Sequence, residues 1–146
     1  MAPFHFRLQQ VLDYRKQLEE QATLALAEAT ARRDAAIAHL QLLATQMAEQ
    51  RERLSHAEGL SAGERWLIQT YQTALREESI QTGKYLTACE EQVDLCRVDL
   101  VKKAQEHELL CKLKEKQALR HAQQARLSEQ REYDETATLR FKNVSF

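Results

Sequence analysis

Residues that could do chemistry are sparse in this chain, and the nearest approach to a site is the run His107-Glu108-Leu109-Leu110-Cys111. On a helix this run places a histidine and a cysteine on one face, which resembles half of a zinc site. A structural zinc ion takes four ligands, and no third and fourth ligand follow at a useful spacing. Cys89 and Cys96 lie seven residues apart, as two packed positions on one helix face do, so both are interpreted as small buried hydrophobic residues. The sequence therefore predicts no metal site and no cofactor.

Catalytic motifs are missing as well. The chain has no glycine-rich phosphate loop and no nucleophile elbow, and a pair of long helices would lack the cleft that excludes water from a reaction. The three cysteines are odd in number and fall on one predicted helix, where bridging partners are out of reach, so free thiols are expected. We therefore expect a protein that is not an enzyme and has no catalytic residue.

The composition predicts the elements that must position these residues. Of 146 residues, 43% are hydrophobic and 29% are charged, and one proline and three glycines are too few turn residues for a sheet or a compact globule. Pro3 precedes the first periodic residue, so long helices are allowed without a kink. No apolar run reaches about 18 residues, and the N-terminus lacks a charged flank followed by an apolar core. These features predict a mostly helical, cytoplasmic protein.

The segment Gly59-Leu60-Ser61-Ala62-Gly63 interrupts the helical pattern and holds two of the three glycines. Glycine is common just past a helix end, and Ser61 with Glu64 three residues later forms a capping-box pattern. Helix one is therefore expected over about 5–58, a hinge over 59–63, and helix two over about 64–141. A short connection between amphipathic helices predicts an all-α fold. We expect an antiparallel two-helix coiled-coil hairpin with a longer second helix, forming one coiled-coil domain over 1–146.

Both predicted helices carry a heptad seam, because apolar or small residues recur at spacings of three and four. Tyr71 is assigned to the core of this seam. Each helix also contains one extra four-residue step, near Ala29–Arg33 and near Leu75–Ser79. Such a step predicts a stutter that locally relaxes the supercoil.

The two seams together predict a register. In an antiparallel hairpin that turns near Ser61, the numbers of facing residues should add up to about 122. Ala36 then faces Leu86, so small residues of helix one meet large residues of helix two. By the same rule Phe4 lies level with Ala118. Residues from about 119 onward should therefore have no partner in their own chain.

Charge is balanced overall, with 21 Lys and Arg against 22 Asp and Glu, but it is uneven along helix two. Residues 76–99 are acidic, whereas residues 102–126 are basic. This pattern is typical of a solvated helix face with ion pairs between neighbouring turns. A structural or nucleic-acid-associated coiled coil is an alternative, although no aromatic interleaving or groove-reading motif accompanies the basic stretch.

Both ends of the chain resemble one protein family. One run near the N-terminus is Phe4-His5-Phe6-Arg7-Leu8-Gln9-Gln10-Val11-Leu12-Asp13-Tyr14-Arg15-Lys16, followed by Glu19-Glu20. This run resembles the opening of FliJ proteins of the bacterial flagellar export apparatus. Their closing helix resembles the runs Leu110-Cys111-Lys112-Leu113-Lys114-Glu115-Lys116-Gln117 and Glu132-Tyr133-Asp134-Glu135-Thr136-Ala137. The resemblance covers the whole chain in length and hinge position.

This resemblance implies a non-enzymatic coiled-coil stalk similar to the central stalk of rotary ATP synthases. Such a stalk sits in the hexameric ring of the export ATPase, promotes its assembly or activity, and links it to the membrane export gate. The resemblance also implies export chaperones as partners and a cytoplasmic protein peripherally associated with the inner membrane at the export apparatus. A stalk of the related virulence-type secretion systems is the alternative that shares the fold. A small-molecule substrate and a nucleic-acid partner are not expected.

Two contact surfaces are expected on such a stalk. The overhang of helix two emerges beside the N-terminus, so contact with the ATPase ring is expected at Phe4, Phe6, Arg7, Arg15, Arg131, Glu132, Asp134, Glu135 and Arg140. The hinge end then stays free for the cytoplasmic domain of the export-gate protein, with contact expected at Leu43, Met47, Trp66, Leu67, Tyr71 and Leu75. Aromatic residues carry much interface energy, which favours docking through Trp66, whereas the alternative is that Trp66 only caps the hairpin tip.

Overall fold

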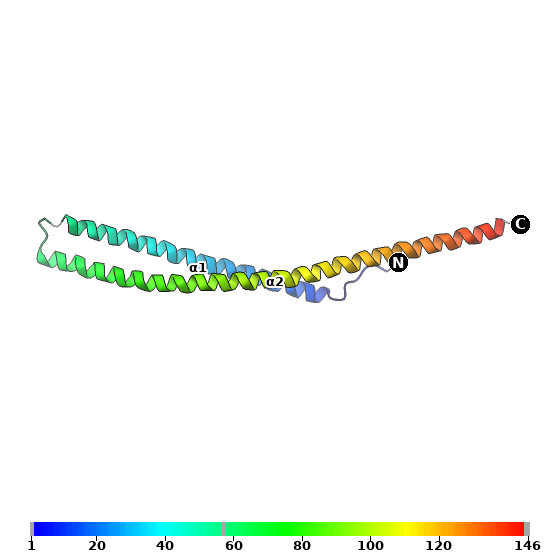
Figure 1. The fold of residues 1–146 in the computed structure, drawn as a ribbon, viewed down its shortest axis with the longest axis horizontal. Helices are drawn as coiled ribbons and strands as arrows, with labels where there is room; N and C mark the ends of the chain where they lie inside the picture. Colours follow the sequence, from blue (N-terminus) through cyan, green and yellow to red (C-terminus); the bar gives the residue numbers. More distant parts are fainter. Residues whose placement is uncertain (1, 57, 145–146) are drawn as a thin grey trace. The chain divides into compact units, whose positions relative to one another are not determined.

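The computed structural model describes residues 2–56 and 58–144, and these residues form an all-α hairpin (Figure 1). Helix α1 spans Gln9–Ser55 and helix α2 spans Ala62–Val144. The two helices pack against each other in antiparallel directions, and α2 is the longer one. The predicted fold class is thus confirmed. The chain divides into two compact units, unit 1 (Met1–Glu19 with Lys102–Phe146) and unit 2 (Glu20–Val101).

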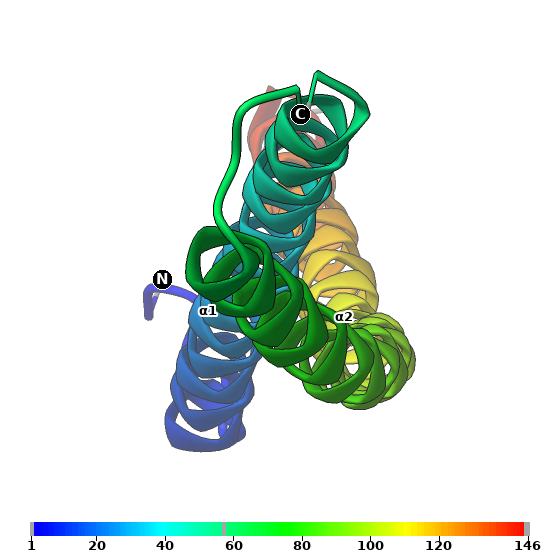
Figure 2. The same ribbon diagram turned by 90° about the vertical axis from the view of Figure 1, so that its left-hand side faces the viewer.

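The hinge belongs to unit 2, and its loop lies in the foreground of Figure 2. The predicted capping box is present, because the Glu64 N–H donates to Ser61 Oγ at 3.2 Å and the Ser61 N–H donates to Glu64 Oε2 at 3.4 Å. Gly59 has a φ of 100°, a conformation that suits glycine. Helix α1 ends at Ser55, before the expected end at about 58. The chain therefore leaves the first helix before it reaches the glycine.

In unit 2, the buried face of α1 follows an unbroken alternation of spacings. The buried residues Ala22, Ala29, Ala36, Leu43 and Gln50 recur every seventh position, and half-buried residues lie four positions after each of them. Leu26, rather than Ala25, occupies the half-buried position after Ala22. The predicted stutter near Ala29–Arg33 is therefore wrong, because the spacing of four and three continues through Leu26 without an extra step. Alanine at the central layers lets the two helix axes approach closely.

The seam of α2 within unit 2 is equally regular. It runs through Ile68, Gln72, Leu75, Ser79, Thr82, Leu86, Cys89, Val93, Cys96 and Leu100, with Leu75, Cys89 and Val93 buried. Tyr71 is 43% exposed, so its assignment to the core is wrong, and so is the stutter inferred near Leu75–Ser79. Because the spacing of four and three residues is regular, Gln72 faces the seam instead of the more apolar Tyr71. The long Gln side chain can bury its methylene groups while its amide reaches the edge of the seam.

In unit 1, the chain before α1 is extended rather than helical. The Gln9 N–H donates to the carbonyl of Phe6 at 3.2 Å, which forms a turn at the start of the helix. Phe6 is only 4% exposed, and the ring of Phe4 lies 5.7 Å from that of His121 at a tilt of 55°. The prediction that residues from about 119 lack a partner is therefore wrong at His121. An extended chain advances about 3.3 Å per residue against 1.5 Å in a helix, so the N-terminal segment reaches farther along α2 than a helix would.

Beyond this contact, α2 continues without cover. Every residue from Glu129 to Asn143 is exposed, including Tyr133 and Phe141. A helix with no buried face depends on its own hydrogen bonds and is marginal in water. Within the described residues, neither helix contains a stretch apolar enough to cross a membrane.

Candidate interaction surfaces

The residues predicted to contact the export gate divide into an exposed and a buried group. Trp66 is 65% exposed and Leu67 is similarly open, with Tyr71 one turn along the helix. Leu43 and Leu75, in contrast, lie fully inside the seam of unit 2, and Met47 is half-buried. The exposed trio Trp66, Leu67 and Tyr71, named the hinge patch below, is therefore the part of this set that is open to a partner. The buried members can only hold the helices beneath it.

An acidic hollow adjoins the hinge patch. Its walls come from the end of α1, the loop and the start of α2, and its lining residues are Glu49, Glu52, Arg53, His56, Glu58, Gly59, Leu60, Glu64, Leu67 and Ile68. The lining combines four carboxylates with the apolar side chains of Leu60, Leu67 and Ile68. This hollow was not predicted from the sequence, because its lining residues lie on segments separated by the hinge.

The residues predicted to contact the ATPase ring also divide into two groups. In the first part of unit 1, Arg15 Nη1 lies 2.7 Å from Glu106 Oε2, which pairs the two helices. Phe6 is buried, whereas Arg7 is exposed and Phe4 is half-buried against His121. Phe6 and Arg15 thus hold unit 1 together. Phe4 and Arg7 keep more surface available to a partner.

The second group lies on the exposed end of α2. Arg131, Glu132, Asp134, Glu135 and Arg140 all have exposed side chains. One groove on this segment is lined by Tyr133, Thr136, Ala137, Arg140 and Phe141, and Phe141 is 76% exposed. The uncovered end of α2, residues 129–143, is named the free segment below. It combines large aromatic rings with charges of both signs.

A chain of polar contacts crosses unit 1 beside the Arg15–Glu106 pair. His107 Nδ1 lies 2.5 Å from Glu19 Oε2, and His107 Nε2 lies 3.4 Å from Cys111 Sγ. The spacing of His107 and Cys111 predicts that they share a helix face, whereas Glu19 belongs to the other helix and was not predicted. The register rule offered a signal, because the numbers of Glu19 and His107 add up to nearly the predicted value. No group of three or more metal-ligating side chains that could hold a metal ion occurs in the described part of the chain.

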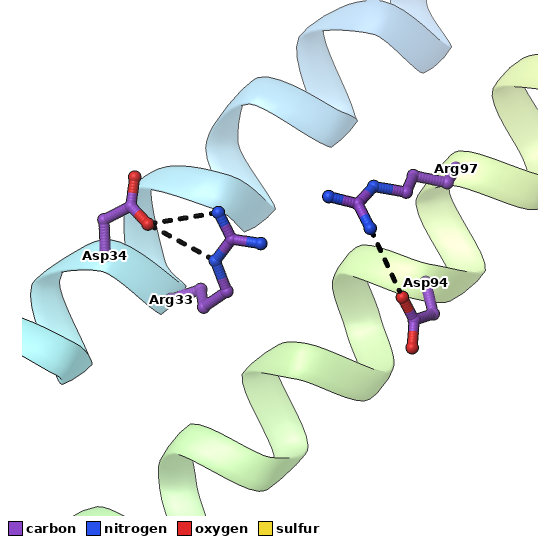
Figure 3. A network of polar contacts seen from close by, with 4 residues as sticks. All are labelled: Arg33, Asp34, Asp94 and Arg97. Carbon is purple, nitrogen blue, oxygen red and sulfur yellow. Dashed lines mark hydrogen bonds and ion pairs between the residues drawn. The ribbon is translucent and has the colours of Figure 1, made fainter.

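Polar contacts in unit 2 lie mainly along its surface. Arg33, a seam residue, donates to Asp34 Oδ1 at 3.2 and 3.3 Å on the same helix, and Arg97 Nη1 lies 3.7 Å from Asp94 Oδ1 on α2 (Figure 3). His39 Nε2 and Glu78 Oε1, 3.0 Å apart, link α1 to α2. Exposed pairs of this kind contribute little to stability.

The family model described as Flagellar FliJ protein matches residues 4–145. Neither a curated protein nor a solved structure matches the chain.

Proposed function

The chain belongs to the FliJ family, and from this premise we propose that it serves as the coiled-coil stalk of the flagellar export ATPase. Family membership makes it a non-enzymatic component of the flagellar protein export apparatus. We further propose which surfaces bind the ATPase ring and the export-gate protein. Unit 1 contacts the hexameric ATPase ring, and the hinge patch contacts the cytoplasmic domain of the export-gate protein. Export chaperones are further partners, for which no surface is assigned.

The free segment is the single observation that best supports contact with the ATPase ring. A fifteen-residue stretch of helix with no buried face presents Tyr133, Leu139 and Phe141 to solvent. Exposed aromatic residues of this size are costly to hydrate and are typical of interfaces. A helix fits the central channel of a ring-shaped ATPase, whose subunits can each supply a part of the cover that the chain itself lacks.

The charges of unit 1 support the same contact. Arg131, Glu132, Asp134, Glu135 and Arg140 offer polar contacts on the free segment, and Arg7 adds one near the N-terminus. Contacts with several ring subunits at once raise the overall affinity above that for any single subunit. We therefore expect weak binding to an isolated ATPase subunit and tighter binding to the assembled ring. The stalk adds no catalytic group and acts by promoting ring assembly or turnover.

The hinge patch supports the proposed contact with the export-gate protein. Trp66 and Leu67 present a large apolar area beside the acidic hollow, and the buried Leu43 and Leu75 fix the helices that carry it. Apolar anchors with a polar rim are typical of protein interfaces. Met47 is half-buried and lies in a shallow surface hollow with Arg51, Gln72 and Arg76.

A truncation after Ser128 tests the ring contact, because it removes the free segment and keeps the Phe4–His121 contact. ATP hydrolysis by the purified export ATPase is measured with the full chain and with the truncated chain. We expect loss of stimulation while circular dichroism shows a folded hairpin. Full stimulation by the truncated chain would overturn the assignment of the free segment as the working end.

A matched control is available at the other surface. Trp66→Ala removes the largest exposed side chain of the hinge patch and leaves unit 1 unchanged. This variant should stimulate the ATPase as well as the unaltered chain does. A general loss of activity in both variants would indicate misfolding, which the helix content measured for each variant identifies.

A further inference from the structure

Glu19, His107 and Cys111 form a hydrogen-bonded relay in unit 1. Glu19 lies on α1, and the other two lie one turn apart on α2, all within unit 1. Glu19 Oε2 is 2.5 Å from His107 Nδ1, and Cys111 Sγ is 3.4 Å from His107 Nε2. All three side chains are half-buried, so the relay is partly shielded from water and still open to a small molecule.

The partners of the two ring nitrogens of His107 determine which nitrogen carries the hydrogen. A carboxylate oxygen only accepts hydrogen bonds, so His107 Nδ1 carries the hydrogen that it donates to Glu19. In the neutral ring this leaves a lone pair on Nε2, and that atom faces the sulfur of Cys111. His107 can therefore take the thiol proton, and the carboxylate of Glu19 stabilises the imidazolium that results.

The other two cysteines lack this arrangement. Cys89 is buried, with Tyr85 as its neighbour one turn away. Cys96 is half-buried like Cys111, but its neighbour is the amide of Gln92, whose Nε2 lies 3.8 Å from the sulfur. An amide nitrogen donates a hydrogen bond and cannot accept a proton. Among the described residues, Cys111 thus combines partial exposure with a positioned base.

We propose that Cys111 is a reactive thiol and a site of thiol–disulfide exchange with low-molecular-weight disulfides. His107 takes the proton of the thiol, and the sulfur of Cys111 forms a bond to one sulfur of the disulfide. The disulfide bond breaks, and its second sulfur leaves as a thiol after accepting the proton from His107 Nε2. Cys111 is oxidised to a mixed disulfide, and the departing half of the reagent is reduced. The net reaction consumes one disulfide and releases one small thiol.

The modification has a structural consequence in unit 1. A mixed disulfide removes the S–H donor to His107 and places a bulky group at a half-buried position next to the Glu19–His107 and Arg15–Glu106 links between the helices. The modified chain should therefore melt at a lower temperature than the unmodified chain. Reduction of the mixed disulfide should restore the original melting temperature.

The test uses the full chain with oxidised glutathione as the disulfide and iodoacetamide as an independent alkylating probe. The modification rate of each cysteine at neutral pH is followed by peptide mass spectrometry. Cys111 should react about tenfold faster than Cys96, since His107 Nε2 is placed to accept the thiol proton as the sulfur attacks. His107→Gln should bring the rate of Cys111 to within about threefold of that of Cys96. Glu19→Gln should give an intermediate rate.

A matched control distinguishes the relay from a general change in exposure. Gln92→Ala removes the side chain that neighbours Cys96 and should leave the rate of Cys111 unchanged. Equal rates for Cys111 and Cys96 in the unaltered chain would overturn the proposal, as would an unchanged Cys111 rate in His107→Gln. Helicity of each variant is measured by circular dichroism. If His107→Gln loses helicity, the comparison of Cys111 with Cys96 in the unaltered chain decides alone.

Discussion

Tyr85 and Cys89 lie one helical turn apart on α2, and the hydrogen bond between them, followed by the charge interaction with Cys89, raises the pKa of Tyr85 above its ordinary value of 10.0. A phenol that donates a hydrogen bond loses that bond when it ionises, so the neutral form is favoured. Any stability from this contact is present below the ordinary pKa and is lost as the pH rises through the raised value.

We expect Cys89→Ala to lower the pKa of Tyr85 toward its ordinary value, because the variant removes the hydrogen-bond partner. The pKa is measured by tyrosinate absorbance in a chain whose other three tyrosines are replaced by phenylalanine. Cys96→Ala serves as the control and should leave the titration of Tyr85 unchanged. An identical titration in the Cys89→Ala chain would show that another group causes the shift.

Only one part of the relay of Glu19, His107 and Cys111 could be recognised from the sequence. His107 and Cys111 share one helix, so their spacing placed them together from the sequence alone. Glu19 is 88 positions away and meets His107 only because the hairpin aligns the two helices. The third group is the carboxylate of Glu19, which accepts a hydrogen bond from His107 Nδ1.

At the scale of the elements, the glycines of the hinge and of α2 have opposite roles. Gly59 holds a φ of 100°, which side-chain-bearing residues rarely adopt, whereas a Cβ added to Gly83 would meet nothing within 4 Å. Gly59→Ala should therefore lower the free energy of unfolding by about 1–2 kcal/mol. Gly83→Ala should raise it by about 0.5–1 kcal/mol, because alanine favours a helix interior. Urea denaturation of both variants measures the direction of each change in the free energy of unfolding. A gain in stability for Gly59→Ala would contradict the hinge geometry.

The seam of α2 offers a second matched pair. Val93 is 1% exposed and Val98 is 70% exposed, although both are valines on the same helix of unit 2. Val93→Ala should cost about 2 kcal/mol of unfolding free energy, because it removes buried methyl groups and leaves a cavity. Val98→Ala should change it by less than about 0.5 kcal/mol. Similar losses in both variants, measured by urea denaturation, would contradict the orientation of this helix.

In α2, the regular heptad spacing rather than the hydrophobicity of single residues decides which side chains face the seam. Placing Tyr71 in the seam on account of its aromatic side chain requires a stutter near Leu75–Ser79. The structure keeps strict spacings of four and three from Ile68 through Gln72 to Leu75. A single polar residue at a seam position costs less than breaking the phase of the whole coiled coil.

At the scale of the whole molecule, the two surfaces should act separately. The double variant Tyr133→Ala with Phe141→Ala should reduce ATPase stimulation about tenfold or more and leave binding to the gate domain unchanged, because each aromatic residue can act as an interface anchor. Trp66→Ala should do the reverse. Gate binding is measured with the purified cytoplasmic domain by calorimetry, and ATPase stimulation is measured with the purified enzyme. Loss of both activities from either variant, with helicity intact, would mean that the two surfaces do not work separately.

The sequence by itself determined the all-α hairpin, the capped hinge at Ser61 and the membership of the FliJ family. These features depend on local patterns: helical hydrogen bonds form within a segment, periodicity marks its buried face, and a glycine-rich break ends it. The family is likewise carried by runs of adjacent residues at the two ends of the chain.

Only the tertiary structure decided which neighbouring residue turns inward, how far the N-terminal segment reaches, and which side chains meet across the helices. Gln72 replaces Tyr71 in the seam, Phe4 reaches His121, and Glu19 completes the relay to Cys111. Each of these depends on how one segment is placed against another. Packing fixes the rotation of each helix to within less than one residue, and an extended segment covers more than twice the distance per residue of a helix, so patterns within one segment cannot specify these contacts.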